Sequence, residues 1–166
     1  MPSIIAIVGR SNSGKTTLIE KLIHYFNMKG KKLSIIKHMK HEFDIDYEGK
    51  DTFRYKEAGA FSSLITNDMM FAIVSKIDDN STPLDLAHNY LNDSDLVIIE
   101  GFREGNIFKI EVIGNSEEKP LYISGVENIA AIVTDQTIET ELPIFQRNDI
   151  ENIGKFIEEY IMNNSA

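Results

Sequence analysis

One segment near the start of the chain constrains the fold more than any other. Residues 9–16, GRSNSGKT, fill every fixed position of the pattern G-x-x-x-x-G-K-[ST], a phosphate-binding loop (Walker A). The apolar run Ile4–Val8 comes directly before it and is typical of a strand buried on both faces of a parallel sheet. After it, apolar residues recur at spacings of three and four up to Phe26, which predicts a helix. A strand, a glycine-rich loop and a helix in this order predict an α/β fold with a phosphate site.

The residue types of this loop suit an anionic ligand. Gly9 and Gly14 let the backbone curl so that successive N–H groups converge on phosphate oxygens, and the dipole of the following helix adds positive potential. Lys15 reaches the β- and γ-phosphates as a point charge, and the Thr16 hydroxyl is suited to hold Mg²⁺. Thr17 is a candidate contact to the α-phosphate. The loop therefore predicts a nucleotide site with a magnesium ion.

A second acid for this magnesium ion is expected at the C-terminal end of a neighbouring buried strand. Glu100 occupies that place, directly after the four apolar residues 96–99. A carboxylate there is costly to desolvate unless a cation or hydrogen bonds compensate it, although a solvated glutamate starting a loop is an alternative interpretation. Arg103, three residues further on, suits a crowded anionic site.

The rest of the chain is expected to form one domain over residues 1–166. Apolar runs predict strands at 33–36, 96–99, 107–113 and 129–133, and helical spacing predicts helices at 52–58, 83–91 and 150–160. Two runs, 61–66 and 69–75, flank Asn67 and Asp68, which predicts an antiparallel hairpin with a two-residue turn. The predicted class is α/β with a P-loop NTPase fold: a mostly parallel central sheet flanked by helices, with additional antiparallel strands.

The charge of the chain is uneven. Its 17 Lys and Arg against 26 Asp and Glu give a formal charge of −9, so the molecule as a whole repels a phosphate backbone and nucleic acid is not an expected partner. Residues 1–74 carry 11 basic and 8 acidic side chains, a net of +3, whereas residues 75–166 carry 6 and 18, a net of −12. The basic half contains the phosphate loop, as expected if an anion binds there.

The sequence lacks the features of a disulfide-stabilised secreted domain and of a membrane protein. There is no cysteine, so disulfides and thiolate metal sites are excluded. No apolar run approaches the roughly 18 residues of a membrane span, and the run Ile4–Val8 has no basic leader or small-residue cleavage site. We expect a soluble cytoplasmic protein that does not associate with membranes.

Residues 37–50 show no apolar periodicity and predict a long functional loop. His38 and His41 lie in it together with aspartates, and because imidazole and carboxylate both ligate metals, a zinc or nickel site is one interpretation. Asp46 is instead a candidate to support the magnesium ion, directly or through water. Other candidate contacts to an anion or a cofactor are Lys37, His38, His41, Lys50, Arg54 and Arg103.

Several segments carry a family resemblance. They are GRSNSGKTTL at 9–18, IKHMKHEFDIDYEGKDTFRYKEAGA at 36–60, LVIIEGFR at 96–103 and IAAIVTD at 129–135. In order and spacing they resemble the MobB family of molybdopterin-guanine dinucleotide biosynthesis adapter proteins. The resemblance implies a homodimeric GTP-binding protein with at most slow GTP hydrolysis. It implies that this protein assists the molybdopterin nucleotidyltransferase, by delivering nucleotide or by bridging that enzyme to the molybdenum-insertion machinery.

The resemblance also implies roles for single residues. Nucleotide contacts are expected from Gly9, Ser11, Asn12, Ser13, Gly14, Lys15, Thr16 and Thr17. Thr16 and Glu100 are the implied magnesium ligands, and Asp46 supports the metal region. The preference for GTP over ATP rests on the resemblance, because the chain has no N-K-x-D motif. Asp135 follows the strand at 129–133 and is a candidate to accept hydrogen bonds from guanine N1–H and N2–H₂. The alternative is that Asp135 is an ordinary acidic residue in the turn that ends this strand.

Two other classes of function use the same scaffold. One is a small-molecule kinase or ATP-dependent ligase whose loop at 37–56 reads an acidic acceptor. The other is a metallochaperone GTPase that uses His38 and His41. No catalytic group is identified, because the sequence names no residue that orients a water for phosphoryl transfer. For a dimer, the strand runs at 61–75 and 107–113 are the expected exposed edges.

Overall fold

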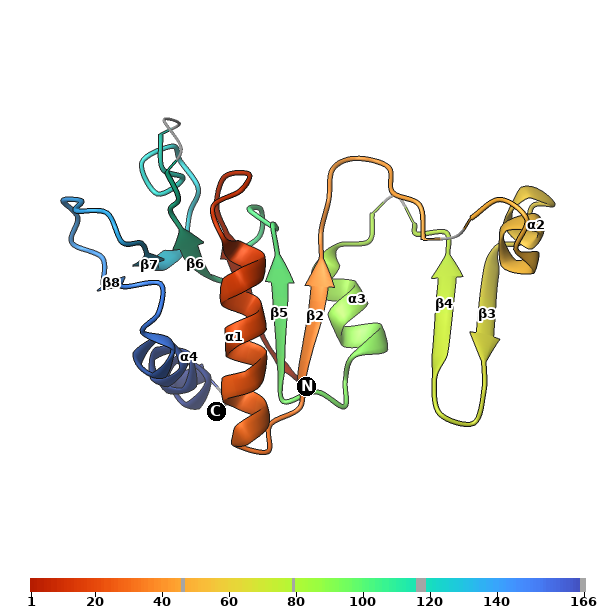
Figure 1. Cartoon of the computed structure of the whole chain (residues 1–166), viewed down its shortest axis with the longest axis horizontal. Coiled ribbons are helices and arrows are strands. Elements are labelled where there is room, and N and C mark those ends of the chain that lie inside the picture. Colours follow the sequence, from red (N-terminus) through yellow and green to blue (C-terminus); the bar gives the residue numbers. More distant parts are fainter. Residues whose placement is uncertain (46, 79, 116–118, 165–166) are drawn as a thin grey trace. The chain divides into compact units, whose positions relative to one another are not determined.

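The computed structural model describes residues 1–45, 47–78, 80–115 and 119–164 (Figure 1). The chain divides into two compact units. Unit 1 comprises Met1–Met39 and Thr82–Ala166, and unit 2 comprises Lys40–Ser81. The phosphate loop belongs to unit 1.

Unit 1 is built on a six-stranded sheet in the order β2-β5-β1-β6-β7-β8. Every pair of neighbouring strands in it is parallel, so the C-terminal ends of all six strands lie at one edge of the sheet. The strands are β1 (Ser3–Val8), β2 (Leu33–Lys37), β5 (Leu96–Glu100), β6 (Phe108–Val112), β7 (Ile129–Val133) and β8 (Ile144–Phe145). This confirms the predicted α/β class with a mostly parallel sheet.

Helices cover both faces of this sheet, as the continuous apolar runs of the central strands require. α1 (Lys15–Met28) and α4 (Ile150–Asn164) pack on one face, where Ile5, Ile98 and Ile110 are fully buried. α3 (Pro83–Tyr90) packs on the other face, against Val97 and Ile99. Full burial of each such side chain stabilises the fold by about 1.5–3 kcal/mol, so the sheet is a rigid base for the loops at its C-terminal edge.

The sheet corrects one expectation about dimer edges. The run at 107–113 forms β6, which lies between β1 and β7 rather than at an edge. Its backbone groups pair on both sides, and Ile110 and Val112 are buried, so this strand is not available to another chain. The sheet also contains β8, a two-residue strand that apolar patterning did not predict because it is too short to show a period.

Unit 2 consists of α2 (Asp51–Glu57) and the antiparallel pair β3 (Ser62–Thr66) and β4 (Phe71–Ser75). The hairpin is confirmed, but its two-residue turn is wrong, because β4 begins at Phe71 and four residues connect the strands. The Asn67 side chain explains the longer turn: its Oδ1 accepts hydrogen bonds from the backbone N–H groups of Met69 (2.8 Å) and Met70 (2.9 Å).

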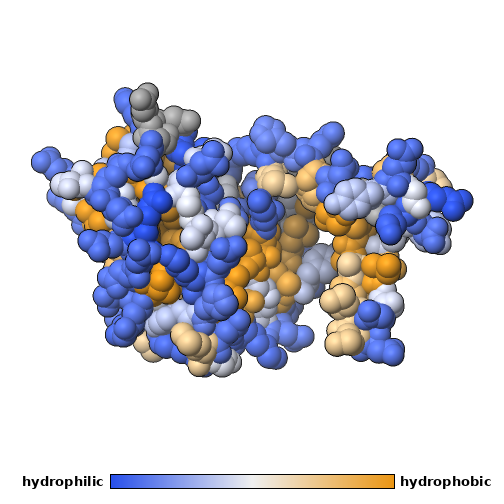
Figure 2. Space-filling view, viewed as in Figure 1, coloured by the Kyte–Doolittle hydropathy of each residue, from blue (hydrophilic) through white to orange (hydrophobic). Residues whose placement is uncertain are grey.

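The described residues of unit 2 include no buried side chain. Apolar residues are instead exposed over the hairpin, among them Leu64, Ile65, Met70, Phe71 and Ile73 (Figure 2). A two-stranded hairpin without a packed face is only marginally stable in water, so this unit presents an apolar surface without a core of its own.

Within the described residues, no helix combines the length and the apolar composition needed to cross a lipid bilayer.

Candidate nucleotide-binding site

The phosphate loop connects β1 to α1 at the C-terminal edge of the sheet and has a backbone that favours glycine. Gly9 and Gly14 have φ values of +152° and +96°, which are unfavourable for side chains with a Cβ. A Cβ on Gly9 would also lie 2.4 Å from the Val112 carbonyl oxygen. Asn12 is left-handed as well, at +56°. The two fixed glycines of the motif are therefore needed for backbone reasons before any ligand is considered.

Lys15, the first residue of α1, folds its side chain back over the loop. Its Nζ donates a hydrogen bond to the Arg10 carbonyl oxygen at 2.7 Å. Burial lowers the pKa of Lys15 below its ordinary 10.5, and the negative charge of Glu100 opposes this shift. The ammonium is thus held in a partly desolvated place, where an anion interacts with it more strongly than in bulk water.

Thr16 and Glu100 meet beside this lysine. β5 pairs with β1 in a register that sets Glu100 opposite Ile7, and the Gly101 N–H donates to the Ile7 carbonyl at 3.0 Å. The Thr16 hydroxyl donates to Glu100 Oε1 at 3.1 Å. Glu100 is 9% exposed, so the structure excludes the interpretation of a solvated loop glutamate.

These two side chains fit a magnesium ion. Mg²⁺ is typically bound by one or two protein oxygens and completes its octahedron with water and substrate phosphates. Thr16 and Glu100 supply a hydroxyl and a nearly buried carboxylate at one point, next to the loop that would hold the phosphates. Among the described residues, no three or more His, Asp or Glu side chains gather into a metal-binding group.

Two further cations surround the site on the side of β2 and β5. Lys37 ends β2 opposite Glu100, and the positive charges of Lys37 and Arg103 both contribute to lowering the pKa of Lys15. His38 follows; its backbone N–H donates to the Glu100 carbonyl at 2.9 Å, and its ring lies edge-on to Phe102. The structure therefore places Lys37 and Arg103 near Lys15 of the phosphate loop, and it places His38 beside the end of β5 and Phe102.

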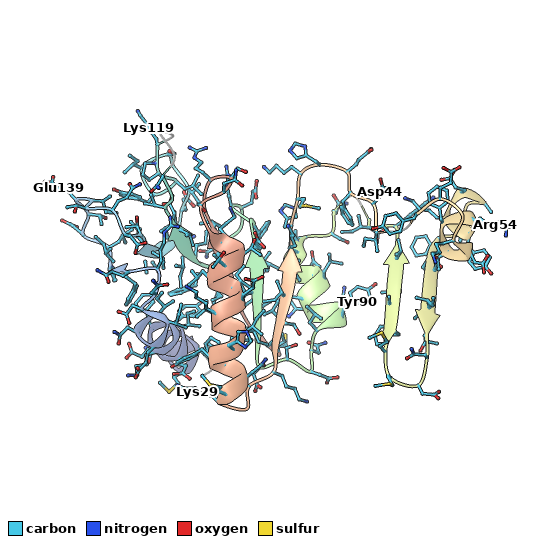
Figure 3. The ribbon with its side chains drawn as sticks, viewed as in Figure 1. Lys29, Asp44, Arg54, Tyr90, Lys119 and Glu139 are labelled. Carbon is cyan, nitrogen blue, oxygen red and sulfur yellow. The ribbon has the colours of Figure 1, made fainter. Side chains whose placement is uncertain are left out.

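The remaining loop residues differ in their surroundings. The Ser13 hydroxyl is buried and makes no hydrogen bond to any residue that the structure describes, so a polar ligand atom would satisfy it. Ser11 and Thr17 are exposed at the loop and at the first turn of α1. Arg10 instead turns to the loop after β6, where its Nε and Nη2 donate to the Lys119 carbonyl oxygen at 3.1 and 2.9 Å; Figure 3 labels Lys119.

Asp135 lies at the C-terminal end of β7, and beside it lies a residue that sequence reasoning missed. The Asp135 carboxylate accepts a hydrogen bond from the Arg147 backbone N–H at 3.1 Å and forms an ion pair with Arg147 Nε at 3.6 Å. Arg147 Nη2 donates to the Ile113 carbonyl at 2.7 Å. Arg147 follows β8, and because that strand was not predicted, nothing in the sequence placed a cation at this edge of the sheet.

The other candidates belong to unit 2. Lys50 is the residue before α2, and Arg54 forms an exposed ion pair with Asp51 at 3.6 Å; Figure 3 labels Arg54 on α2. His41 is exposed in the same unit. Asp46, the candidate support for magnesium, lies outside the described residues.

Comparison with protein families gives a match over most of the chain. The model described as "Molybdopterin guanine dinucleotide synthesis protein B" (MobB) matches residues 4–135. A relative from Haemophilus influenzae, named molybdopterin-guanine dinucleotide biosynthesis adapter protein, is 35% identical over 95% of this chain and 89% of its own length. A relative of the same name from Escherichia coli is 27% identical over 97% of this chain and 94% of its own length.

Solved structures agree in fold. A crystal structure of molybdopterin-guanine biosynthesis protein B superposes with a TM-score of 0.76 at 27% identity, covering 96% of this chain and 99% of the other. The crystal structure of Bacillus subtilis MobB gives a TM-score of 0.74 at 26% identity, covering 95% and 96%.

Proposed function

The chain belongs to the MobB family, and from this premise we propose that it is a GTP-binding adapter protein of molybdopterin guanine dinucleotide biosynthesis. The name of the family and of its relatives supports the biosynthetic role. The observation that carries nucleotide binding is the convergence of Lys15, Thr16 and Glu100 at the mouth of a glycine-lined loop. A phosphate chain and a magnesium ion fit this combination of ammonium, hydroxyl and carboxylate.

In this proposal the phosphate loop divides the work among its residues. The backbone N–H groups from Gly9 to Thr17 hold the phosphates, and the Ser13 hydroxyl gains the partner that it lacks among the described residues. Lys15 turns from the Arg10 carbonyl to the phosphates. Thr16 and Glu100 hold Mg²⁺, whose charge neutralises phosphate oxygens when it is bound.

GTP rather than ATP is proposed as the nucleotide. Asp135 supports this, because a carboxylate accepts hydrogen bonds from guanine N1–H and N2–H₂, and adenine lacks both of these donors. It lies at the same edge of the sheet as the phosphate loop, two strands from β1. We propose slow hydrolysis at most, because efficient phosphoryl transfer also needs a group that orients the attacking water, and the sequence identifies none.

We propose that the protein acts as a homodimer through unit 2. On one face of its hairpin, Leu64 lies directly opposite Ile73, next to Phe71, and these side chains are 56%, 41% and 70% exposed. The outer edges of β3 and β4 are free of strand partners within the described residues. A second copy would cover the apolar face and pair with an edge.

The proposed partners are the molybdopterin nucleotidyltransferase and the molybdenum-insertion machinery, in the cytoplasm. The test is a pull-down with the purified nucleotidyltransferase, paired with the yield of guanine dinucleotide cofactor in cells that lack this protein. We expect recovery of the enzyme and a reduced yield. No contact and an unchanged yield would contradict the adapter role, and rapid ATP turnover on a small acceptor would favour a kinase instead.

A further inference from the structure

Three neighbouring strand ends converge beside the phosphate loop on the side away from the magnesium acid. β6, β7 and β8 follow β1 in the sheet, and their ends carry Ile113, Asp135 and Arg147. Arg147 holds this corner together: its Nη2 donates to the Ile113 carbonyl at 2.7 Å, and its Nε lies 3.6 Å from Asp135 Oδ2. The arginine and the aspartate at this corner are thus held in place by their contacts with each other and with the backbone.

The arginine also lies against the phosphate loop itself. Its Nη1 is 3.1 Å from the point where a Cβ on Gly14 would be, so the guanidinium lies over the glycine at which α1 begins. Nη1 donates no hydrogen bond to any residue within the described part of the chain. Its side chain is 33% exposed, and that of Asp135 is 62% exposed, so a ligand can reach both. The pair therefore has donors and an acceptor left for a molecule held by the loop.

The two sides of β1 differ in chemistry. On the β5 and β2 side lie Glu100, Lys37 and Arg103, which suit magnesium and the terminal phosphates. On the β6 to β8 side lie Asp135 and Arg147. A triphosphate held in the loop with its γ-phosphate at Glu100 would extend its nucleoside to the opposite side of β1, where Asp135 and Arg147 lie.

The hydrogen-bonding pattern of this corner matches guanine. Guanine has the acceptors O6 and N7 and the donors N1–H and N2–H₂, and arginine binds O6 and N7 with two parallel hydrogen bonds. Adenine has an amino donor in place of O6 and an acceptor at N1, so it meets the arginine with a donor and the carboxylate with an acceptor. An arginine beside an aspartate is therefore suited to guanine and opposes adenine.

We propose that Arg147 is a specificity residue that binds guanine at O6 and N7, while Asp135 binds the N1 and N2 side. This inference rests on the proposed GTP binding and adds to it the group that selects the base. The carboxylate of Asp135 also fixes the orientation of Arg147, since its Oδ1 accepts from the Arg147 backbone N–H at 3.1 Å. The two residues act as one reader of the base.

The test measures affinities for GTP, 7-deaza-GTP, ITP and ATP, each with Mg²⁺, in the full chain. Arg147→Met should weaken GTP by about 10- to 100-fold while changing ATP by no more than about twofold. The wild type should bind 7-deaza-GTP, which lacks the N7 acceptor, about tenfold more weakly than GTP, and Arg147→Met should bind the two equally. ITP lacks the N2 amine, so the wild type should bind ITP more weakly than GTP. This difference in affinity should persist in Arg147→Met and disappear in Asp135→Asn.

A purely structural role of Arg147 predicts a different pattern. Arg147→Met would then lower the affinities for GTP and ATP by the same factor, and the wild type would bind 7-deaza-GTP and GTP with equal affinity. Either result overturns the inference. Arg147→Lys, which keeps the positive charge and donors on a single nitrogen, controls for misfolding and should retain part of the preference for GTP over ATP. If the wild type binds no triphosphate at all, the proposed function fails as well, whereas GTP binding without dependence on Arg147 for base choice overturns this inference alone.

Discussion

Thr16 and Glu100 are separated by 84 positions in the sequence, yet the Thr16 hydroxyl donates to Glu100 Oε1 at 3.1 Å. The parallel pairing of β1 with β5 produces this contact, because it sets the end of β5 beside the loop that follows β1. Thr16 and Glu100 are the two described side chains that we propose as magnesium ligands, and this contact brings them together.

Glu100→Gln should therefore remove much of the magnesium dependence of GTP binding. The amide keeps the shape of the side chain but not its charge, and we expect the enhancement of GTP affinity by Mg²⁺ to fall by at least about tenfold. Calorimetric titration of GTP with and without Mg²⁺ measures this enhancement. Glu104→Gln, four residues away and exposed, is the matched control and should behave as the wild type. Equal magnesium dependence in all three proteins would exclude Glu100 as the magnesium acid.

Gly154 should not tolerate alanine, although it lies within α4. A Cβ there would lie 2.2 Å from Tyr25 Cε1. The Tyr25 ring is held in place because its hydroxyl donates to Glu158 Oε2 (3.1 Å) and accepts from Lys29 Nζ (2.7 Å). Overpacking costs about 1–3 kcal/mol, which exceeds the gain of about 1 kcal/mol from helix propensity. Urea unfolding should show Gly154→Ala to be less stable than the wild type.

Tyr25→Leu supplies the control for this prediction. In that background the space around position 154 is larger, so Gly154→Ala should cost less and the two changes should be coupled. An unchanged free energy of unfolding for Gly154→Ala in the wild-type background would show that α1 and α4 are not packed as closely as the structure has them.

Asp85 should titrate below its usual range. Hydrogen bonds from the Thr82 hydroxyl and backbone N–H, both at 2.7 Å, lower the pKa of its carboxyl below 3.8 in the capping box of α3. Because the folded pKa is depressed, this contribution to stability is present above pH 3.8 and is lost as the pH falls through the folded value. NMR titration should give a pKa below 3.8 in the wild type and in Thr82→Ser, and a higher one in Thr82→Ala. The same pKa in all three would contradict the capping box.

Leu64→Lys should convert the proposed dimer into a monomer. The lysine would place a charge on the exposed apolar face of the hairpin, where a second copy is proposed to pack, at a cost of several kcal/mol for an unpaired buried charge. Sedimentation at micromolar concentration measures the effect. Met28→Lys, at an exposed methionine at the end of α1, should leave the dimer intact. Sedimentation of the wild type only as a monomer would contradict the proposed dimer.

Much of unit 1 was predictable from the sequence, because its signals are local. The glycine-rich motif predicted the loop between β1 and α1, and the carboxylate ending an apolar run predicted the nearly buried Glu100 at the end of β5. The charge asymmetry was consistent with these, since Lys15 and Lys37 of the basic half lie near each other at the loop, where Arg103 of the acidic half joins them. Each of these features lies within a few residues of the strand that positions it.

What the sequence did not reveal depends on strand order and on short elements. The run at 107–113 looks the same whether it lies at an edge or in the interior, and only the pairing of β6 with β1 and β7 decides this. Arg147 escaped notice because β8 has two residues and no period. The turn at Asn67 was misjudged because its side chain accepts from two backbone N–H groups and so supports a four-residue connection.

Calorimetric titration of Mg²⁺-GTP into the wild type and into Lys15→Ala tests directly whether this loop binds a nucleotide. We expect saturable binding of GTP to the wild type, weaker binding of ATP, and loss of both in Lys15→Ala, because the ammonium at the loop is removed. Absence of binding to the wild type, or equal binding by both proteins, would contradict a nucleotide site at this loop.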